Sequence, residues 1–298
     1  MALTSLLDLP APAKLNLFLH ITGRRPDGYH LLQSAFVLID WADTLHLERR
    51  ADGRLQRHDL GPALPADDLS LRAARALQAA SGCTLGADIS VLKRVPWGAG
   101  MGGGSSDAAT VLLGLNRLWG LGWPRARLLD LGVRLGADVP FFVGGENAWV
   151  EGIGERLTPI AWAPRRYAVV KPAESLATAA IFSHPGLARD TKPATLEGSF
   201  ADMNGASSAF GHNDLQPVAE ALCPAITQVA SWLEHRYGNS RMTGSGSAVF
   251  AEVAEGVDER GGAGDQPVAT WPEGELPAGW VGRLCRSLPH HPLRGWAD

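Results

Sequence analysis

Several stretches of the chain alternate apolar and polar residues, the period of a β-strand that buries one face. In residues 13–21, leucine and isoleucine take every second position, and Lys14 and Asn16 lie between them. We therefore expect a strand here with Lys14 and Asn16 together on the face opposite the core. The same pattern predicts further strands at 34–40, 43–48, 87–95, 147–151 and 165–172, and a strand–turn–strand unit at 240–253.

Other stretches repeat apolar residues every three or four positions, which predicts helices. Residues 67–82 begin with two aspartates and end in glycine, so both helix-boundary signals are present. A second helix should run from about Ser105 to Leu118, a third should begin after Pro124, and a fourth should cover 225–238. The zone before Gly211 is rich in loop residues, and 255–280 shows no periodicity, so we expect loops there.

Glycines crowd the junction between the strand at 87–95 and the helix after it. Five of the seven residues from Gly98 to Gly104 are glycine. A helix N-terminus exposes unpaired N–H groups, and glycines in front of it let the backbone approach an anion without Cβ atoms in the way. The stretch therefore predicts a phosphate-binding loop, although a flexible linker is the plain structural alternative.

Two better-known phosphate loops do not fit this stretch. Gly98, Gly100 and Gly103 match G-x-G-x-x-G, but no acidic residue follows about 20 positions later to hold a ribose. A P-loop needs lysine after its second glycine, where this chain has Gly104. The loop therefore predicts phosphate binding of another kind.

Composition narrows the class of protein. The 298 residues are 45% apolar and 19% charged with a formal net charge of −4, so a globular chain without a basic surplus for nucleic acid is expected. Cys83, Cys223 and Cys285 form no CxxC pair or metal-ligand cluster, which favours a reducing compartment. With no signal-peptide pattern and no apolar run of about 18 residues, we expect a soluble cytoplasmic protein that binds neither membrane nor nucleic acid.

Four stretches, 12–34, 95–109, 135–143 and 242–251, together resemble the GHMP small-molecule kinases. The opening Pro-Ala-Lys-Leu-Asn-Leu and the later Asp-Gly-Tyr-His resemble the members that act on a cytidine diphosphate compound. The resemblance implies an α+β fold with two domains: 1–171, a nucleotide-binding domain like domain 2 of ribosomal protein S5, and 172–298, a ferredoxin-like domain. It also implies direct in-line phosphoryl transfer from ATP to a hydroxyl during isoprene biosynthesis.

The same resemblance assigns roles to individual residues. Asp138 would be the base that deprotonates the acceptor hydroxyl, and Lys14 would keep it ionised and help neutralise the transferring group. The loop around the ATP phosphates would comprise Pro96, Trp97, Gly98, Ala99, Gly100, Met101, Gly102, Gly103, Gly104, Ser105 and Ser106. The residues facing the substrate would be Asn16, Tyr29, His30, Phe182, Gly244, Ser245 and Gly246, with Tyr29 and Phe182 on either side of the cytosine and His30 at its edge.

Each of these residues also has a plain structural role open to it. Asp138 precedes Val139 and Pro140, as a helix N-cap often does. Lys14 could be solvated, Tyr29 and His30 could be turn residues, and 243–247 could be a hairpin turn. Another GHMP kinase, or a nucleotide-binding module without catalysis, are the alternative functions.

Mg²⁺ would accompany ATP, held by the phosphates rather than by a protein cage, with Ser106 as a candidate hydroxyl ligand. Two segments, 173–211 and 255–280, depart from the family pattern, so Phe182 and Thr178 are placed by approximate position. Trp97 stands where the family has a smaller or unbranched residue, and it could pack on the adenine.

Overall fold

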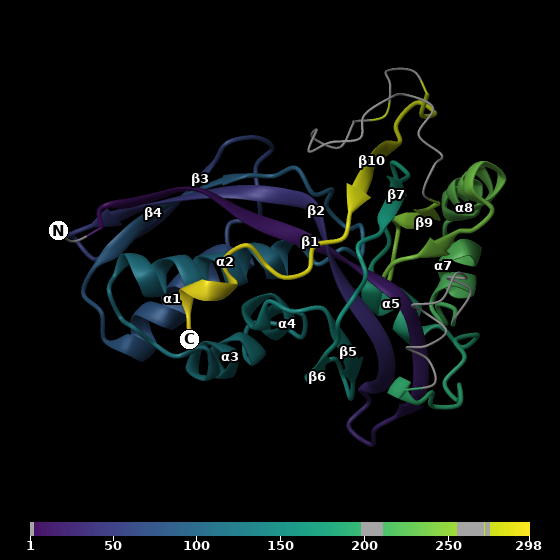
Figure 1. The fold of residues 1–298 in the computed structure, drawn as a ribbon, viewed down its shortest axis with the longest axis horizontal. Coiled ribbons are helices and arrows are strands. Elements are labelled where there is room, and N and C mark those ends of the chain that lie inside the picture. Colours follow the sequence, from purple (N-terminus) through teal and green to yellow (C-terminus); the bar gives the residue numbers. More distant parts are fainter. Residues whose placement is uncertain (1–2, 198–210, 255–270, 272–274) are drawn as a thin grey trace.

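Two long strands, β1 (Ser5–Arg24) and β2 (His30–Arg50), pair antiparallel along most of their length. The computed structural model describes residues 3–197, 211–254, 271 and 275–298. In Figure 1 the pair runs from the end of the molecule that holds both termini to the side where α5 (Thr178–Ser183) lies. The stretches 34–40 and 43–48, expected as separate strands, are both parts of β2.

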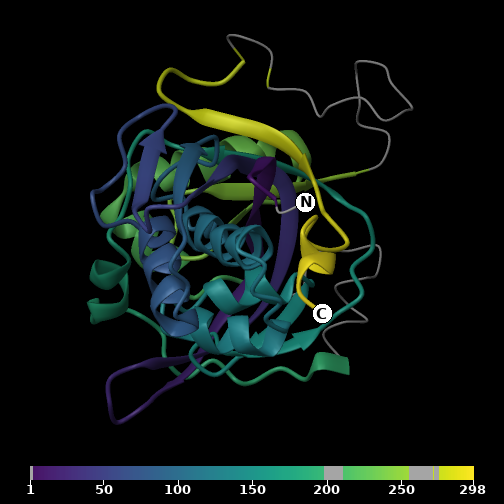
Figure 2. The ribbon, with the colours of Figure 1, turned by 90° about the vertical axis from the view of Figure 1, so that its left-hand side faces the viewer.

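The first sheet has six strands in the order β3-β4-β2-β5-β6, with β1 paired to β2. Four helices and a large apolar cluster cover it, and Figure 2 shows the helices gathered together. The remaining strands of this sheet are β3 (Leu55–Asp59), β4 (Gly86–Leu92), β5 (Ala148–Glu151) and β6 (Arg156–Pro159). The helices are α1 (Leu69–Ser81), α2 (Gly103–Leu118), α3 (Arg125–Val133) and α4 (Val139–Gly144).

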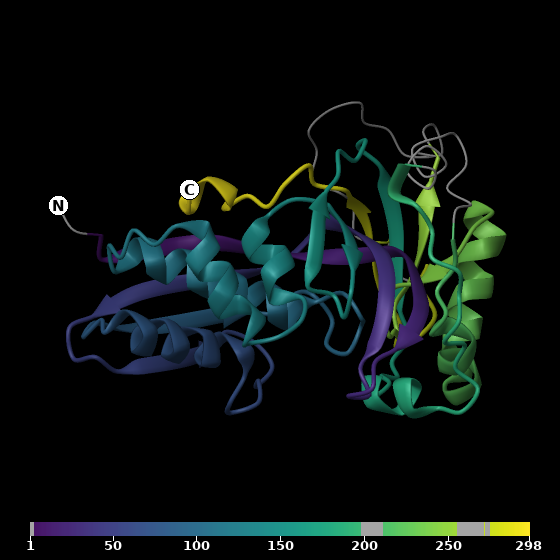
Figure 3. The ribbon, with the colours of Figure 1, turned by 90° about the horizontal axis from the view of Figure 1, so that it is seen from below.

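The second sheet has four strands in the order β10-β7-β9-β8. Its strands are β7 (Arg166–Lys171), β8 (Arg241–Met242), β9 (Val249–Val253) and β10 (Val281–Arg286). Two helices, α7 (Gln216–Leu222) and α8 (Pro224–Tyr237), pack beside it, as Figure 3 shows. The tail then returns to the first sheet and ends in a short 3₁₀ turn at Arg294–Trp296.

Helix boundaries follow the sequence signals. The Asp68 side chain caps α1 by accepting from the amides of Ser70 (3.3 Å) and Leu71 (3.2 Å), and Gly82 ends the helix in a left-handed conformation. Helix α2 begins at Gly103, two residues before the expected start, because Gly102 adopts the left-handed conformation and serves as its N-cap.

Three expectations need correction. Strand β1 is buried on both faces, so Lys14 (3% exposed) and Asn16 (1%) are not on a solvated face. Strand β7, expected to close the first domain, pairs with β9 and β10 in the second sheet. The loop zone before residue 211 contains α5, and most of 255–280 lies outside the described residues.

The C-terminal tail returns to the first sheet, and β7 from the expected first domain pairs in the second sheet. The proposed domain division at residue 171 therefore remains a prediction. Within the described residues, no helix is long and apolar enough to cross a bilayer.

Candidate active site

The glycine loop follows β4 and leads into α2. Gly98, Gly100 and Gly102 all have left-handed φ angles, +64°, +72° and +70°. A Cβ at position 100 would lie 2.3 Å from the carbonyl oxygen of Thr243, so only glycine fits this approach to the second sheet. The glycine loop thus packs against the loop that joins β8 and β9.

Two adjoining cavities, each of about 360 Å³, share the glycine loop as a wall. The first, here called the nucleotide cavity, is lined by residues 96–105, Lys93, Val95, Leu69, Leu176 and Thr178. The second, the acceptor cavity, is lined by Lys14, Asn16 and Asp138 and by residues 244–246. Gly98, Gly100 and Gly102 line both. A ligand in one cavity can therefore meet a ligand in the other.

Lys14 and Asp138 form an ion pair in the acceptor cavity. Lys14 Nζ lies 3.9 Å from Asp138 Oδ2 and 4.6 Å from the centre of the Phe36 ring, and it donates to Asn16 Oδ1. Burial lowers the pKa of Lys14, and the charge of Asp138 opposes that shift in part. The Lys14 amide also donates to Met101 O (3.0 Å), which ties β1 to the glycine loop.

Asp138 occupies the N-cap position of α4, but its side chain makes no capping hydrogen bond. The side chain is 30% exposed and faces the acceptor cavity. Its position thus matches the structural alternative, whereas its carboxylate remains free for chemistry.

Asn16 serves the site from a buried position. Its backbone amide donates to Thr243 Oγ1 (2.9 Å), and its Nδ2 donates to Ser34 Oγ (3.0 Å). These bonds aim Oδ1 at Lys14 and join β1 to the β8–β9 loop. Asn16 therefore orients Lys14 as well as lining the acceptor cavity, a role not expected from sequence.

The β8–β9 loop supplies Gly244, Ser245 and Gly246, which line the acceptor cavity as expected. The Ser245 and Thr178 hydroxyls are 2.7 Å apart, and Ser247 N donates to Gly98 O (3.0 Å). The two glycine-rich motifs, far apart in sequence, thus lie against each other.

The aromatic residues expected around a base are only partly assembled. The His30 and Phe182 ring centres are 5.0 Å apart, and Phe182 lines the acceptor cavity. Arg189 Nε donates to His30 Nε2 (3.1 Å), and burial together with the charges of Arg189 and Arg24 lowers the pKa of His30. Tyr29 is 60% exposed and lines neither cavity.

Lys93 is a site residue that sequence reasoning missed. It lines the nucleotide cavity and pairs with two buried carboxylates, Asp43 and Asp107 (2.6 Å to Oδ2 of Asp107). Burial lowers the pKa of Lys93, but the two carboxylates outweigh it and raise the net value. Its place at the end of the strand before the glycines was the available signal.

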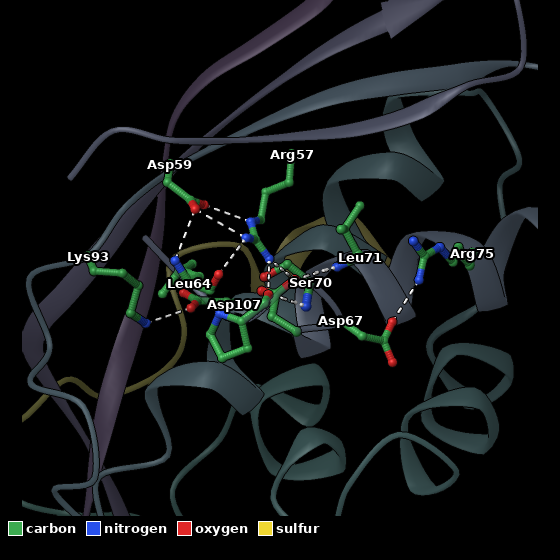
Figure 4. Close-up of polar contacts among 11 residues, drawn as sticks. Arg57, Asp59, Leu64, Asp67, Ser70, Leu71, Arg75, Lys93 and Asp107 are labelled. Carbon is green, nitrogen blue, oxygen red and sulfur yellow. Dashed lines mark hydrogen bonds and ion pairs between the residues drawn. The ribbon is translucent and has the colours of Figure 1, made fainter. Parts of the chain in front are cut away.

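Figure 4 shows Lys93 and Asp107 beside a second polar network that fixes the segment between β3 and α1. Arg57, with an 8% exposed side chain, pairs with Asp59 and Asp68 at 2.7 Å each and donates to the Leu64 carbonyl at 3.1 Å. Leu69, next to Asp68, lines the nucleotide cavity. The network therefore stabilises one wall of that cavity.

Ser105 lines the nucleotide cavity, whereas Ser106 lines neither cavity. The Oγ of Ser106 is buried and has no hydrogen-bond partner among the described residues. Trp97, 62% exposed, stands at the rim of the nucleotide cavity. In the described part of the chain, no group of three or more His, Cys, Asp or Glu side chains could hold a metal.

Two family models match the chain. Residues 68–146 match the GHMP kinases N-terminal domain, and residues 191–260 match the GHMP kinases C-terminal domain. Among solved structures, that of a 4-(cytidine 5'-diphospho)-2C-methyl-D-erythritol kinase has a TM-score of 0.73 and 37% identity, covering 84% of this chain and 91% of its own. A homoserine kinase from Cytophaga hutchinsonii, 17% identical with a TM-score of 0.62, shares the fold and covers 83% and 84%.

Full-length relatives are closer in sequence. A 4-diphosphocytidyl-2-C-methyl-D-erythritol kinase from Methylibium petroleiphilum is 63% identical over 298 residues, all of both chains. One of the same name from Variovorax paradoxus is 57% identical over 304 aligned residues, 98% of this chain and 99% of its own. The expected two-domain α+β kinase fold is thus confirmed. The chain belongs to the 4-diphosphocytidyl-2-C-methyl-D-erythritol kinase family of GHMP kinases, and it is a small-molecule kinase.

Proposed function

We propose that this protein transfers the γ-phosphoryl group of ATP to the 2-hydroxyl of 4-diphosphocytidyl-2-C-methyl-D-erythritol, a step of the non-mevalonate route to isoprenoid precursors in the cytoplasm. The observation that carries the proposal is the Lys14–Asp138 pair, which lies in the cavity that adjoins the glycine loop. The names of relatives at 63% and 57% identity support the choice of acceptor.

Asp138 acts as the base in this proposal. Its carboxylate makes no capping bond and faces the acceptor cavity, so an oxygen is available to accept the hydroxyl proton. Phosphoryl transfer needs mainly alignment and charge stabilisation, and one well-placed carboxylate meets the need for a base.

Lys14 supplies positive charge where the phosphoryl group crosses between the cavities. Its ammonium is held by Asn16 and Phe36 and lies beside Asp138. Burial disfavours the charged ammonium, and an anionic phosphoryl group arriving nearby would restore its preference for the charged form. The pair is therefore suited to a charge that arrives with the substrates.

His30 reads the cytosine edge. Because Nε2 accepts from Arg189 and the lowered pKa keeps the ring neutral, the ring proton resides on Nδ1. Nδ1–H can donate to the O2 or N3 acceptor of cytosine. Phe182, which lies beside His30, provides a face on which the base stacks, worth about 1–3 kcal/mol, and the exposed Tyr29 would stack on the other face.

ATP binds with its phosphates over the glycine loop and the first turn of α2, and Lys93, the residue after β4, lines the same cavity. Mg²⁺ would be held by the ATP phosphates and would offset part of their negative charge. Ser106, the candidate hydroxyl ligand in that first turn, has a buried Oγ without a partner among the described residues but lines neither cavity, so its Oγ does not face the phosphate site in this structure.

The test is ADP release from ATP and Mg²⁺ with four acceptors. They are 4-diphosphocytidyl-2-C-methyl-D-erythritol, the corresponding erythritol phosphate without the cytidyl group, homoserine and mevalonate. Turnover with the cytidyl compound alone is expected. Turnover with another acceptor would leave the kinase assignment standing but would contradict the roles of Tyr29 and His30. ATP binding without any turnover would indicate a nucleotide-binding module.

A further inference from the structure

The β8–β9 loop lines the acceptor cavity together with Lys14 and Asp138, and its position there depends on the residues that hold it. We infer that Asn213, a residue outside both cavities, is the positioning residue that holds it. The inference rests on the proposed function of the acceptor cavity, and it concerns a residue to which the reaction itself assigns no role.

Asn213 is 2% exposed and satisfies its side chain entirely with backbone groups. Its Nδ2 donates to Met242 O (2.7 Å) and to Gly244 O (2.8 Å), and its Oδ1 accepts from Leu215 N (2.9 Å). Both amide hydrogens therefore hold the carbonyl groups at the start of the β8–β9 loop. A side chain that can donate twice and accept once in this geometry is an amide.

The segment that carries Asn213 is itself fixed to β1. Leu19 N donates to His212 O (2.9 Å), and Asp214 N donates to Leu19 O (2.8 Å). The Asp214 carboxylate also accepts from Ile21 N (2.6 Å). Strand β1 holds Lys14 and Asn16, so Asn213 links the strand on one side of the acceptor cavity to the loop on the other.

A shift of the loop would reach both substrates. Thr243 Oγ1 accepts from Asn16 N, and Ser247 N donates to Gly98 O of the glycine loop. The Thr243 carbonyl leaves no room for a Cβ at Gly100. Because the contacts are this close, the loop cannot move without disturbing Asn16 and the phosphate loop.

Asn213→Asp tests this link, since it keeps the size of the side chain and points an anion at two carbonyl oxygens. Asn239→Asp is the matched control: Asn239 Nδ2 donates to Tyr237 O and Glu252 O (3.0 Å each), and its Oδ1 accepts from Glu252 N (2.7 Å), away from both cavities. Each variant replaces an amide that donates to two backbone carbonyl groups. Only the first should act on catalysis.

For Asn213→Asp we expect kcat/KM for the cytidyl acceptor to fall about 10- to 100-fold, because a displaced β8–β9 loop would no longer position the acceptor. For Asn239→Asp we expect the kinetic constants to stay within about twofold, with a smaller loss of Tm because Asn239 is only partly buried. Equal, small kinetic effects in the two variants would overturn the inference and leave Asn213 a structural residue.

Hydrogen–deuterium exchange gives a readout independent of the acceptor. In Asn213→Asp the amides of residues 243–248 should exchange faster than in wild type, and in Asn239→Asp they should not. Asn213→Ser, which keeps one donor, serves if the aspartate variant does not fold, and unchanged exchange at 243–248 in a folded variant contradicts the inference. Should wild type fail to phosphorylate the cytidyl compound, the proposed function fails, and exchange still decides the role of Asn213.

Discussion

Lys14 lies in a buried environment that disfavours its charged form. It is 3% exposed, and burial lowers its pKa. Its carboxylate partner, Asp138, is 3.9 Å away and partly exposed, so the pair offsets only part of the desolvation. A buried ion pair is often no more stabilising than an apolar side chain of similar size, so the pair is expected to add little to stability, in line with the catalytic role proposed for Lys14.

Replacement of Lys14 should therefore separate activity from stability. Lys14→Met should lower kcat about 10²- to 10³-fold through lost charge stabilisation, while Tm stays equal to or above that of wild type. Lys171→Met is the control. Lys171 is also buried but donates to Pro172 O (2.8 Å) and Glu174 O (2.9 Å), so its loss should cost about 1–3 kcal/mol.

The pH dependence of stability tests whether charged Lys14 destabilises the fold. A pKa that is lower in the fold than in the unfolded chain means that charged Lys14 destabilises the fold fully below the folded pKa. The penalty fades as pH rises through that value toward 10.5, the ordinary lysine value. Any Tm advantage of Lys14→Met should fade likewise, and a large Tm loss at neutral pH would contradict this account.

The first turn of α2 contains the last two glycines of the run, Gly103 and Gly104. Gly104 lies in this turn and lines the nucleotide cavity, and a Cβ there would be 3.9 Å from Leu69 Cδ1. The protein has room for alanine at this position, so packing alone does not require glycine. The proposed phosphate binding gives a reason for glycine here, because a side chain would obstruct close approach of the anion.

Gly104→Ala should therefore stabilise the protein by about 0.5–1 kcal/mol and raise the KM for ATP about tenfold. Gly144→Ala is the control, because Gly144 ends α4 outside both cavities with nothing within 4 Å of an added Cβ. It should add stability without changing KM. Equal KM values in Gly104→Ala and wild type would show that the loop does not cradle phosphate.

Sequence patterns predicted where helices and strands begin and end better than they predicted what packs against them. Boundary signals at Asp68, Gly82 and Pro124 were local, and the structure confirmed them. Burial of Lys14 was not predictable, because alternation describes one strand and both faces of β1 are covered by distant elements. Asn213 and Lys93 act through partners up to 31 and 50 residues away, and no local pattern encodes such contacts.

At the scale of the whole molecule, the cavities lie where segments of both sheets meet. The C-terminal tail binds back to the first sheet and its helices. After β10 the chain crosses back, and Leu288 N donates to Leu38 O (2.8 Å) and His291 N to Gly145 O (2.8 Å). His291 is fully buried, and its Nδ1 accepts from Leu293 N (3.0 Å). The C-terminal residues thus complete the packing of the first sheet and its helices.

This anchor should make stability sensitive to acid. Burial, with the charges of Arg125 and His290, lowers the pKa of His291 from 6.5 to about 3. Protonation then favours the unfolded chain, so its contribution is complete above pH 6.5 and is lost as pH falls toward 3. At pH 5 the loss is about 2 kcal/mol.

Urea unfolding of wild type and His291→Asn at pH 7 and pH 5 measures this term. Asparagine keeps an acceptor near Nδ1 and does not titrate, so the variant should lose about 2 kcal/mol less than wild type between the two pH values. The comparison cancels every other titrating group. Parallel losses in the two proteins would show that His291 is not responsible.

The most direct test of the whole account is the kcat of Asp138→Asn with ATP, Mg²⁺ and the cytidyl acceptor. Asparagine serves as well as aspartate at an N-cap and Asp138 makes no capping bond to lose, so α4 should be unchanged, and Tm should fall only slightly through loss of the ion pair with Lys14. With the base removed, kcat should fall about 10²- to 10⁴-fold while the KM for ATP stays within about twofold. A variant with kcat near that of wild type would contradict the assignment of Asp138 as the base.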